Sequence, residues 1–390
     1  MKVLLVVPDT DMGGVTTAAV NLTNELSRRG NDVYFLDMSN AVRCRERFDE
    51  KIRILSLDSR SSFWNISKAS TANRQGMKRI GLLLLGAVKK LTVKSGLWYH
   101  LVFSKFKECG EFDVAIAFRQ GLPCYTFVLN KVSAKKKIGF VHGELELMGY
   151  KLAWEKCMPH FDKVAYVSDA VKTQFISAFP HLRSNACTVY NMFDIEKLRE
   201  DAKREPSFVM DDACVNIVTV SRIDNYFKMT QRIVEICERL KNQTKKPFHW
   251  YVVGDGPDFE DTVALARERG VEDVLTYVGA QSNPHTIVSR SDFTVLTSRS
   301  EAYPMVVIES FILEKPIVVA KFGSAFEMIQ QEQNGLVAEQ SVDSLTACVL
   351  DMIEDRNGVR SCCVDYLQQH VISNDRAYAQ FIDAVEGECE

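Results

Sequence analysis

The chain has 390 residues, of which 46% are hydrophobic and 25% are charged, enough for two domains with ordinary buried cores. A formal net charge of -3 gives no overall attraction to nucleic acid, so we expect no nucleic-acid partner. The 11 cysteines include no C-x-x-C pair, which favours reduced thiols over a disulfide framework and therefore a cytoplasmic protein.

The first predicted element is a strand at residues 3–7, a continuous apolar run typical of strands that are buried on both faces of a parallel sheet. Gly13 and Gly14 follow, then apolar residues at helical spacing up to Leu26, and then a strand at residues 32–38. A strand, a glycine loop, a helix and a strand in this order indicate a doubly wound α/β domain. Further strands in this half are predicted at 114–118, 137–141 and 163–167.

A polar stretch near residues 202–214 predicts a linker, and the same alternation begins again after it. Strands of this second half are predicted at 216–220, 250–253, 275–278, 293–297 and 316–320. We therefore expect an N-terminal domain at 1–205 and a C-terminal domain at 206–372. A helix at about 373–390 is expected to pack back onto the N-terminal domain.

Two such domains are expected to place the carboxyl ends of their strands, where α/β sheets bind ligands, on either side of a cleft. Gly13 and Gly14 lie where the first strand meets the first helix, so a phosphate or a sugar could approach the helix amides there. A simple tight turn explains the glycine pair equally well. The absence of G-x-G-x-x-G weighs against a nicotinamide or flavin cofactor.

Arg222 and Lys228 follow the first strand of the second half. Two cations that converge at the end of a strand suit a diphosphate, although each of them could also be an ordinary surface charge. Gly254 lies in the turn of "VVGDGP", where glycine either lets a ligand approach the backbone or simply suits the turn.

Glu301 and Glu309 lie in "SRSEAYPMVVIES", which we interpret as a loop followed by a helix with Pro304 in its first turn. An ionised carboxylate accepts hydrogen bonds from sugar hydroxyls, so Glu301 is a candidate ligand of a sugar and Glu309 of a ribose. The free amides of Met305, Val306 and Val307 favour phosphate oxygens. The alternative is a helix-capping acid followed by a solvated helix residue.

Together these features resemble the GT-B retaining glycosyltransferases of family 4 (glycosyl transferases group 1), whose second domain carries an E-x(7)-E element. Glu301 and Glu309 match that element. The resemblance covers nearly the whole chain, through the Gly13-Gly14 loop, "FVHGE", "VSDAVKTQF", "VYNMFD", the Arg222 and Lys228 pair, "VGDGP" and "FGSAFEMI…QNGLV". It implies two Rossmann-like domains that face each other across a cleft, with the acceptor on the N-terminal domain and the nucleotide sugar on the C-terminal one.

The resemblance also implies roles for individual residues. His142 would lie near the donor sugar and the leaving phosphate, whereas a lone histidine after a strand is otherwise often structural. Arg222 and Lys228 would bind the donor diphosphate, Glu301 the donor sugar and Glu309 the ribose. Further substrate contacts are expected at Gly13, Gly14, Asn191, Gly254, Tyr303, Met305, Val306 and Val307.

The chain departs from the family pattern at three positions. Met229 replaces the glycine that usually follows the lysine, Met192 replaces the glycine of the usual Asn-Gly, and Pro304 replaces the glycine after the aromatic residue. These changes concern loop geometry and donor preference more than the class of activity.

The implied reaction is transfer of a sugar with its anomeric configuration retained, with the leaving diphosphate helping to deprotonate the acceptor. Charge on that diphosphate is then stabilised by Arg222, Lys228 and helix amides, so no metal or other cofactor is required. Asp9 and Asp11 form an Asp-x-Asp that could be interpreted as a metal site, but they lie in the first strand-to-helix loop and the cationic pair makes a metal redundant.

A basic segment at residues 60–107 suggests that the acceptor is lipid-linked. It contains ten Lys or Arg residues and no Asp or Glu, interleaved with residues such as Trp64, Trp98, Tyr99 and Phe103. This composition is typical of reversible binding to an anionic membrane surface, although a solvated basic face over a core helix is the alternative. No apolar run reaches the roughly 20 residues of a membrane span.

We therefore expect a UDP-sugar-dependent hexosyltransferase that acts on a lipid-linked or saccharide acceptor in envelope or exopolysaccharide synthesis. The expected location is the cytoplasm, with peripheral attachment to the inner face of the membrane. The alternatives are a phosphorylase or a sugar-nucleotide epimerase of the same fold, a non-catalytic partner subunit, and, more distantly, an NAD-binding oxidoreductase.

Overall fold

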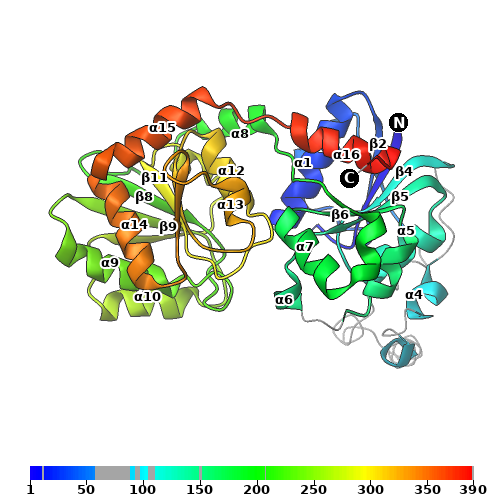
Figure 1. The fold of residues 1–390 in the computed structure, drawn as a ribbon, viewed down its shortest axis with the longest axis horizontal. Coiled ribbons are helices and arrows are strands. Elements are labelled where there is room, and N and C mark those ends of the chain that lie inside the picture. The colour runs from blue at the N-terminus through cyan, green and yellow to red at the C-terminus, as the bar shows by residue number, and fades with distance from the viewer. Residues whose placement is uncertain are drawn as a thin grey trace, which may run out of the picture. The chain divides into compact units, whose positions relative to one another are not determined.

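A computed structural model of the chain consists of two compact units (Figure 1). One unit is Met1–Phe193 together with Asn374–Glu390, and the other is Asp194–Ser373. The structure describes residues 1–10, 13–57, 88–92, 97–103, 110–148, 152–206 and 208–388.

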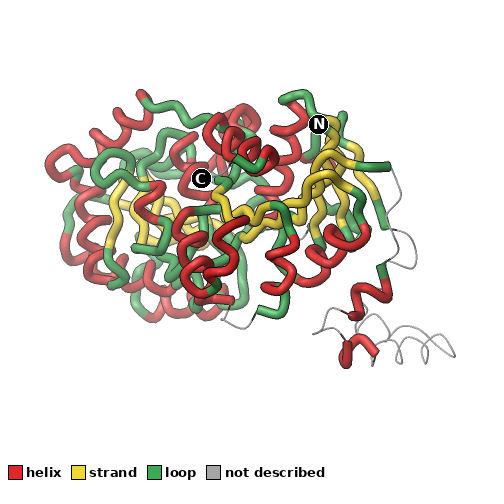
Figure 2. Tube along the Cα trace, turned by 45° about the vertical axis from the view of Figure 1, so that its right-hand side comes forward, coloured by secondary structure: helices red, strands yellow, loops and turns green. Residues whose placement is uncertain are grey.

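The N-terminal unit is built on a parallel seven-stranded sheet in the order β3-β2-β1-β4-β5-β6-β7, and Figure 2 shows the strands in yellow. The central strands β1 and β4 are mostly apolar and buried, because helices cover both faces of a parallel sheet. The strands are β1 Lys2–Val7, β2 Asp32–Asp37, β3 Arg53–Leu55, β4 Phe112–Ala117, β5 Ala134–Val141, β6 Lys163–Tyr166 and β7 Ala186–Thr188.

Helices of the N-terminal unit bury apolar stripes against this sheet. The last helix of the chain, α16, contacts β5 and β6. Asn374, just before α16, exchanges two hydrogen bonds with the backbone of Phe193, at 2.9 and 2.8 Å. The helices are α1 Gly14–Arg28, α4 Leu97–Val102, α5 Leu122–Lys131, α6 Leu145–Met148, α7 Asp169–Ala178 and α16 Asp375–Glu386, with short 3₁₀ turns at Arg45–Arg47, Glu155–His160 and Pro180–Asn185.

The C-terminal unit has a parallel six-stranded sheet in the order β10-β9-β8-β11-β12-β13. Numbered within the unit this is 3-2-1-4-5-6, the Rossmann order, in which the direction of winding reverses between the first and fourth strands. The strands are β8 Val215–Val220, β9 Phe248–Val253, β10 Leu275–Gly279, β11 Phe293–Leu296, β12 Ile317–Ala320 and β13 Gly335–Ala338.

The two faces of the C-terminal sheet pack against different helices. Ile217 and its same-face neighbours form the larger core with α9, α10, α14 and α15, and Figure 1 shows α9, α10 and α14 gathered together. Val218 and Tyr251, on the opposite face, pack on α11 and on Met210. The helices are α8 Ile195–Ala202, α9 Gln231–Gln243, α10 Phe259–Glu268, α11 His285–Val288, α12 Met305–Ile312, α13 Ala325–Met328, α14 Val342–Glu354 and α15 Val359–Gln369, with a 3₁₀ turn at Arg356–Gly358.

All ten strands predicted from the sequence are present, and the fold is the expected pair of parallel α/β units. Three short strands at the sheet edges were missed, β3, β7 and β13. These strands are only three or four residues long, and each contains a charged residue, a cysteine or a glycine, as in "RIL" and "GLVA". Such short segments carry too little periodicity to be recognised from the sequence.

The division between the units lies earlier than the predicted boundary at residue 205. Helix α8 belongs to the C-terminal unit, because it packs on α11 and α12 and because its last turn accepts hydrogen bonds. Asn283 Nδ2 donates to the Asp201 carbonyl at 2.7 Å, and Ser289 Oγ donates to the Ala202 carbonyl at 3.1 Å. The polar composition at 202–214 marks a surface loop that follows the boundary.

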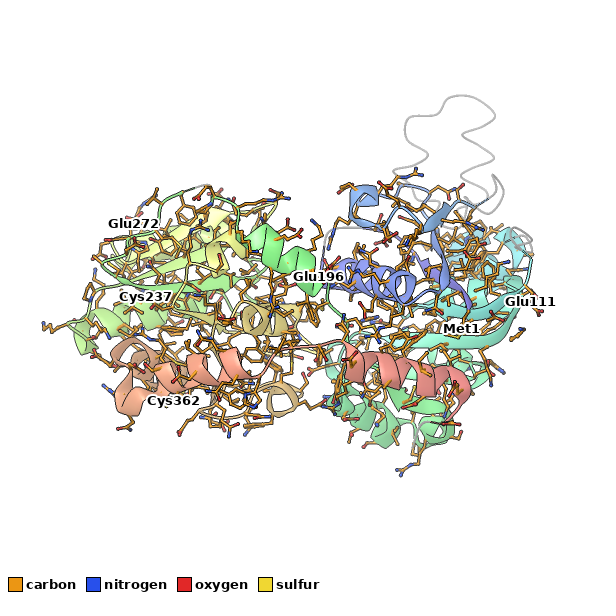
Figure 3. All side chains as sticks on the ribbon, turned by 90° about the horizontal axis from the view of Figure 1, so that it is seen from above. Met1, Glu111, Glu196, Cys237, Glu272 and Cys362 are labelled. Carbon is orange, nitrogen blue, oxygen red and sulfur yellow. The ribbon has the colours of Figure 1, made fainter. Side chains whose placement is uncertain are left out.

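The cysteines among the described residues are free thiols. Cys237 on α9 is buried, which raises the pKa of its thiol, and Cys362 on α15 is exposed (Figure 3). In the described part of the chain, the helices are too short or too polar to cross a bilayer.

Candidate functional site

The reversal of winding in the C-terminal sheet occurs between β8 and β11, which are hydrogen-bonded neighbours. Parallel α/β sheets bind ligands outside the carboxyl ends of the strands at such a point. The loop after β8 carries Arg222 and Lys228, and the loop after β11 carries Glu301. The fold therefore places these three predicted residues at the edge of the sheet where ligands are expected.

Lys228 and Glu301 form an ion pair, with 2.5 Å between Nζ and Oε1. The side chains are 30% and 12% exposed, so the pair is shielded but open on one side. Two further hydrogen bonds join the loops: Thr297 Oγ1 donates to the Lys228 carbonyl, and the Arg299 amide donates to the Phe227 carbonyl, both at 2.9 Å. The structure thus brings together the predicted cation and the predicted sugar-binding carboxylate.

The loop after β8 is held by its own polar side chains. Asp224 Oδ1 accepts hydrogen bonds from the amides of Tyr226 and Phe227, both at 2.9 Å. Asn225 Oδ1 accepts from Thr230 Oγ1 and from the Gln231 amide, at 2.8 and 3.0 Å. Lys228 is therefore presented on a loop whose backbone is fixed before any ligand arrives.

Met229 adopts a left-handed backbone conformation, with φ of 52°. This is the position where the related pattern has glycine, and a left-handed φ is the conformation that favours glycine. Methionine at this position therefore holds a backbone conformation that costs local strain.

Arg222 is exposed and, among the described residues, has no ionic partner. The backbone on either side of it touches the glycine turn after β9. A Cβ at Gly254, where φ is +149°, would meet the Ser221 carbonyl oxygen at 1.8 Å, and one at Gly256 would meet the Ile223 carbonyl oxygen at 2.1 Å. Glycine is thus required at residue 254 by the protein's own chain, which favours the turn interpretation of that residue.

Glu309 lies on α12, and its Oε2 is 3.8 Å from Nε2 of His285. The two side chains are 17% and 22% exposed. His285, the first residue of α11, carried no sequence signal, because its pairing with Glu309 joins two different helices of the fold. Pro304 is the residue before the helix, whereas we predicted it in the first turn, and the amides of Met305 and Val306 begin the helix.

The loop that carries Glu301 is positioned by Gln340, which sequence analysis missed. Gln340 Nε2 donates to the carbonyls of Lys321, Ser298 and Arg299, at 2.8, 3.1 and 3.2 Å. Its Oε1 accepts from Arg232 Nη1 at 2.7 Å. One amide side chain therefore ties the loops after β11 and β12 to α9.

Three aromatic side chains near this site are exposed. Tyr226 and Phe227, two residues and one residue before Lys228, are 63% and 37% exposed, and Phe326 on α13 is 62% exposed. The Arg299 guanidinium lies 5.5 Å from the centre of the Tyr226 ring. Exposed aromatic rings that gather around a polar site are typical of ligand-binding surfaces.

In the N-terminal unit His142 follows β5 and packs against Phe118 and Phe140, with ring centres 4.5 and 5.8 Å away. Burial lowers the pKa of His142 to about 3, although a hydrogen bond to the Phe118 backbone opposes the shift. The imidazole is therefore neutral near pH 7. Its Nε2 is buried without a hydrogen-bond partner in the described structure, so it is an available acceptor for a hydroxyl.

The corresponding winding reversal in this unit lies between β1 and β4. There Arg119 Nη1 donates to Asp9 Oδ1 at 2.9 Å, and Gln120 Oε1 accepts from the His142 amide at 3.1 Å. Asp9 is thus engaged by an arginine, and Asp11 lies outside the described residues. Within the described ranges no cluster of potential metal ligands is found.

The remaining predicted contacts are spread over both units. Gly13 is the residue before α1, and a Cβ built there would meet nothing within 4 Å. Asn191 is partly buried in the segment after β7, whose neighbour Tyr190 donates its amide to Gln380 Oε1 of α16 at 3.1 Å. Gly14 is the first residue of α1, and Tyr303 and Val307 flank the start of α12.

The basic segment is only partly described, at residues 88–92 and 97–103. There Trp98, Tyr99 and Phe103 are buried at 1%, 6% and 2% exposure, so these three aromatic residues do not contribute to a membrane-binding surface, while membrane attachment of the segment as a whole stays a prediction. α4 packs on α5, and the Phe103 ring stands edge-on to Phe127. Leu91, by contrast, is 83% exposed beside Lys90. The other residues of 60–107 lie outside the described part.

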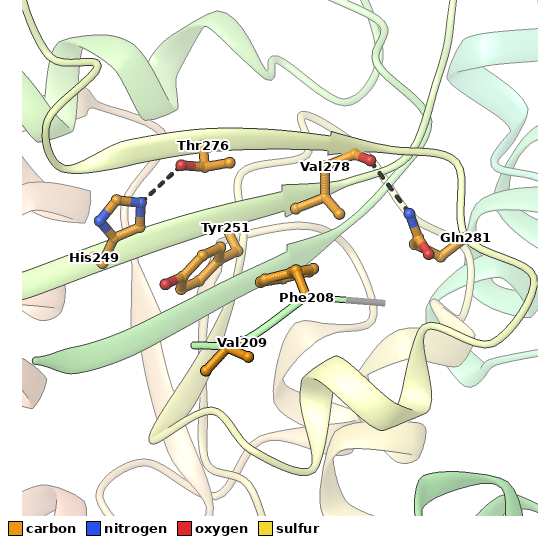
Figure 4. Close-up of a pocket in the computed structure, with 7 residues that line it drawn as sticks. All are labelled: Phe208, Val209, His249, Tyr251, Thr276, Val278 and Gln281. Carbon is orange, nitrogen blue, oxygen red and sulfur yellow. Dashed lines mark hydrogen bonds between the residues drawn. The ribbon is translucent and has the colours of Figure 1, made fainter. Parts of the chain in front are cut away.

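A pocket of about 500 Å³ lies beside β9 and β10 (Figure 4). His249 and Tyr251 contribute to it from the middle of β9, and His249 Nε2 is 2.8 Å from Thr276 Oγ1 of β10. None of the predicted site residues lines it. Its lining is Phe208, Val209, His249, Tyr251, Thr276, Val278 and Gln281.

Comparisons with known proteins agree with this architecture. N-acetyl-alpha-D-glucosaminyl L-malate synthase of Bacillus anthracis is 24% identical over 155 residues, 39% of this chain and 40% of that relative. The O-antigen biosynthesis glycosyltransferase WclY of Escherichia coli is 20% identical over 85% of this chain and 83% of its own length. The crystal structure of Anabaena Alr3699/HepE in complex with UDP superposes with a TM-score of 0.69 at 15% identity, covering 99% of this chain and 100% of that one.

The family model described as glycosyl transferases group 1 matches residues 204–369, which is most of the C-terminal unit and includes Arg222, Lys228, Glu301 and Glu309. With two parallel-sheet units and these structural neighbours, the chain has the GT-B fold, and its C-terminal unit matches the group 1 glycosyl transferases.

Proposed function

We propose that the protein is a retaining glycosyltransferase that transfers a hexose from a nucleotide-diphospho sugar to an acceptor hydroxyl. The observation that carries this proposal is the Lys228–Glu301 pair at the β8/β11 reversal, with exposed Arg222 on the same loop. A shielded cation beside a carboxylate suits a ligand that has both a diphosphate and sugar hydroxyls.

In the proposed reaction Lys228 exchanges part of its contact with Glu301 for the donor diphosphate. Arg222 and the amides at the start of α12 add positive charge to the same anion. As the bond to the sugar breaks, negative charge develops on the diphosphate, and groups already in place stabilise it without reorganisation. Glu301 is left to accept hydrogen bonds from sugar hydroxyls. The reaction as proposed uses no metal ion.

Glu309 is proposed to accept hydrogen bonds from the ribose of the donor. It is partly buried on α12 and 3.8 Å from His285, so it is held in place while one side remains accessible. UDP is the favoured nucleotide, since the structural neighbour HepE binds UDP. On the N-terminal unit His142 is proposed to act as a neutral hydrogen-bond acceptor for the transferred sugar, because a ring with so low a pKa cannot be a cation at neutral pH.

The proposed acceptor is a saccharide or a lipid-linked saccharide of an envelope polysaccharide, used at the cytoplasmic face of a membrane. Support comes from the relative WclY, whose name assigns it to O-antigen biosynthesis. Exposed Leu91 beside Lys90 is consistent with a peripheral contact to anionic lipid.

A thermal-shift screen against UDP, GDP and ADP sugars tests the donor assignment, because a ligand that binds only the folded state raises its stability. We expect UDP sugars to raise the melting temperature and Lys228→Ala to abolish the shift, while Lys321→Ala, which breaks an exposed ion pair, leaves it unchanged. NMR of the product should show the donor's anomeric configuration. Isomerisation of the donor without an acceptor, or consumption of a disaccharide that depends on free phosphate, would contradict the proposal.

A further inference from the structure

A second pocket lies in the N-terminal unit, at the carboxyl ends of β2 and β3. Its volume is about 470 Å³. Parallel pairing aligns Leu36 with Leu55, so the segments after both strands leave the sheet at the same level. We call it the β2–β3 pocket, and it is lined by Asn40, Ala41, Val42, Arg43, Arg45, Ile54, Leu55 and Ser56.

A buried hydrogen-bond network holds one wall of the β2–β3 pocket, formed by residues 40–43. Asp37, which is fully buried at the end of β2, accepts a hydrogen bond from Thr10 Oγ1 at 2.7 Å. The same hydroxyl accepts from the Arg43 amide at 3.0 Å. The path of residues 40–43 is thus fixed by a buried polar network rather than by surface contacts.

Asn40 joins the two sides of the pocket. Its Oδ1 accepts from the Leu57 amide at 2.8 Å, and its Nδ2 donates to the Leu57 carbonyl at 3.2 Å. The residue has a φ of 58°, a conformation that asparagine adopts more readily than most residues. The segments after β2 and β3 are therefore clamped together, which preorganises the space between them.

The charge of the lining has one sign. Arg43 and Arg45 are the charged residues among the eight that line the pocket, and both are exposed. Val42, Ile54 and Leu55 supply an apolar wall. Arginine presents several N–H donors in a planar fork that matches phosphate oxygens. A rigid space with two guanidinium groups and an apolar wall suits a phosphate ester that carries an apolar or sugar substituent.

We propose that the β2–β3 pocket binds the phosphate group of a phosphorylated acceptor. The term acceptor rests on the proposed glycosyltransferase function, whereas the phosphate site itself does not. The phosphate belongs either to a lipid diphosphate or to a free sugar phosphate. In the lipid case the apolar wall contacts the start of the hydrocarbon chain, and in the other case only the arginines contribute.

The test is calorimetric titration of the full-length protein with inorganic diphosphate, glucose 1-phosphate and farnesyl diphosphate. The double variant Arg43→Ala/Arg45→Ala should weaken binding of at least one of these ligands by roughly tenfold or more, since each lost charge-assisted hydrogen bond is worth that much. Tighter binding of farnesyl diphosphate than of inorganic diphosphate identifies a lipid source, and equal binding identifies a free phosphate. Raising the salt concentration should weaken binding in either case.

Three variants separate this site from other effects. Lys51→Ala removes one positive charge from an exposed residue that does not line the pocket, and binding should not change. Arg43→Lys/Arg45→Lys keeps both positive charges, so it should retain much of the affinity that a folded alanine double variant loses. Lys228→Ala should lose the thermal shift with UDP but keep the phosphate site. The inference is overturned if the alanine double variant binds all three ligands like wild type, or if Lys51→Ala loses as much affinity.

Discussion

The two units share one winding order, yet the edges where their strands end differ in chemistry. In the C-terminal unit the reversal between β8 and β11 carries Lys228, Glu301 and exposed Arg222. In the N-terminal unit the reversal between β1 and β4 carries an Asp9–Arg119 pair, and His142 beside it is neutral. The first edge suits a highly charged ligand and the second an uncharged hydroxyl. One scaffold thus presents two different chemistries through its loops alone.

The largest effect should come from Lys228→Ala. The change removes a cation from the proposed diphosphate site and leaves Glu301, which is 12% exposed, without its partner. Loss of one preorganised charged contact costs about 2.7 to 4 kcal/mol in the transition state, so turnover should fall by roughly 10²- to 10³-fold. This fall in turnover is measured by steady-state kinetics with the UDP sugar that the thermal-shift screen identifies.

Lys321→Ala is the matched control for that experiment. Its partner Glu339 is 71% exposed, and such surface pairs contribute little. Turnover of the control should remain within about twofold of wild type. If Lys228→Ala and Lys321→Ala lowered turnover equally, the effect would depend on positive charge in general and not on the position of Lys228. The distinction between the two edges would then be lost.

Glu309→Ala should have the next largest effect and act on binding rather than on turnover. A carboxylate that accepts ribose hydroxyls contributes charge-assisted hydrogen bonds of about 1.5 to 3 kcal/mol, so UDP affinity should fall by roughly 10- to 100-fold. Titration calorimetry with UDP measures this loss. His285→Ala removes the neighbour at 3.8 Å and should have a smaller effect, because the carboxylate itself remains. Unchanged UDP affinity in Glu309→Ala would contradict the ribose assignment.

The neutral state of His142 predicts a pH dependence of stability. Its folded pKa of about 3 lies below the unfolded value, so the unfolded chain takes up a proton first as the pH falls. Its contribution is complete above the unfolded pKa of about 6.5 and is lost as the pH falls toward the folded value. Relative to His142→Gln, wild type should lose up to about 1.4 kcal/mol per pH unit below 6.5.

Urea unfolding of both proteins at pH 7.5 and pH 5 measures this difference. A gap between wild type and His142→Gln that stays constant with pH would show that the imidazole is solvated and charged in the folded state. The contrast drawn between the charged edge of the C-terminal unit and the neutral His142 would then be lost.

Buried strands and glycine turns made the architecture predictable from sequence. Continuous apolar runs such as Val3–Val7 identify central parallel strands, because every side chain there is buried. The edge strand β13 was missed because its four residues begin with Gly335. At the site, the Lys228–Glu301 pair was anticipated as two residues of one binding site, but not as an ion pair.

Contacts that depend on tertiary packing were not predictable. The pairing of Glu309 with His285, the role of Gln340 and the Asp9–Arg119 pair each join segments that are distant in the chain. The aromatic residues of the basic segment misled for a related reason: Trp98 is buried on α4, a helix of six residues that packs on α5 and is too short to show a clear periodicity. Composition alone does not distinguish a buried aromatic face from an exposed one.

The smallest expected effect belongs to Met229, which tests how the charged edge is shaped. A residue other than glycine in the left-handed region costs roughly 1 kcal/mol, and glycine removes that strain while it gains freedom in the unfolded chain. Met229→Gly should therefore change the free energy of unfolding by less than about 1 kcal/mol and leave turnover close to wild type. Met229→Val, whose branched side chain tolerates φ of 52° poorly, should instead lower both stability and UDP affinity by displacing Lys228. If valine were tolerated as well as glycine, the strained turn would have no part in presenting the lysine.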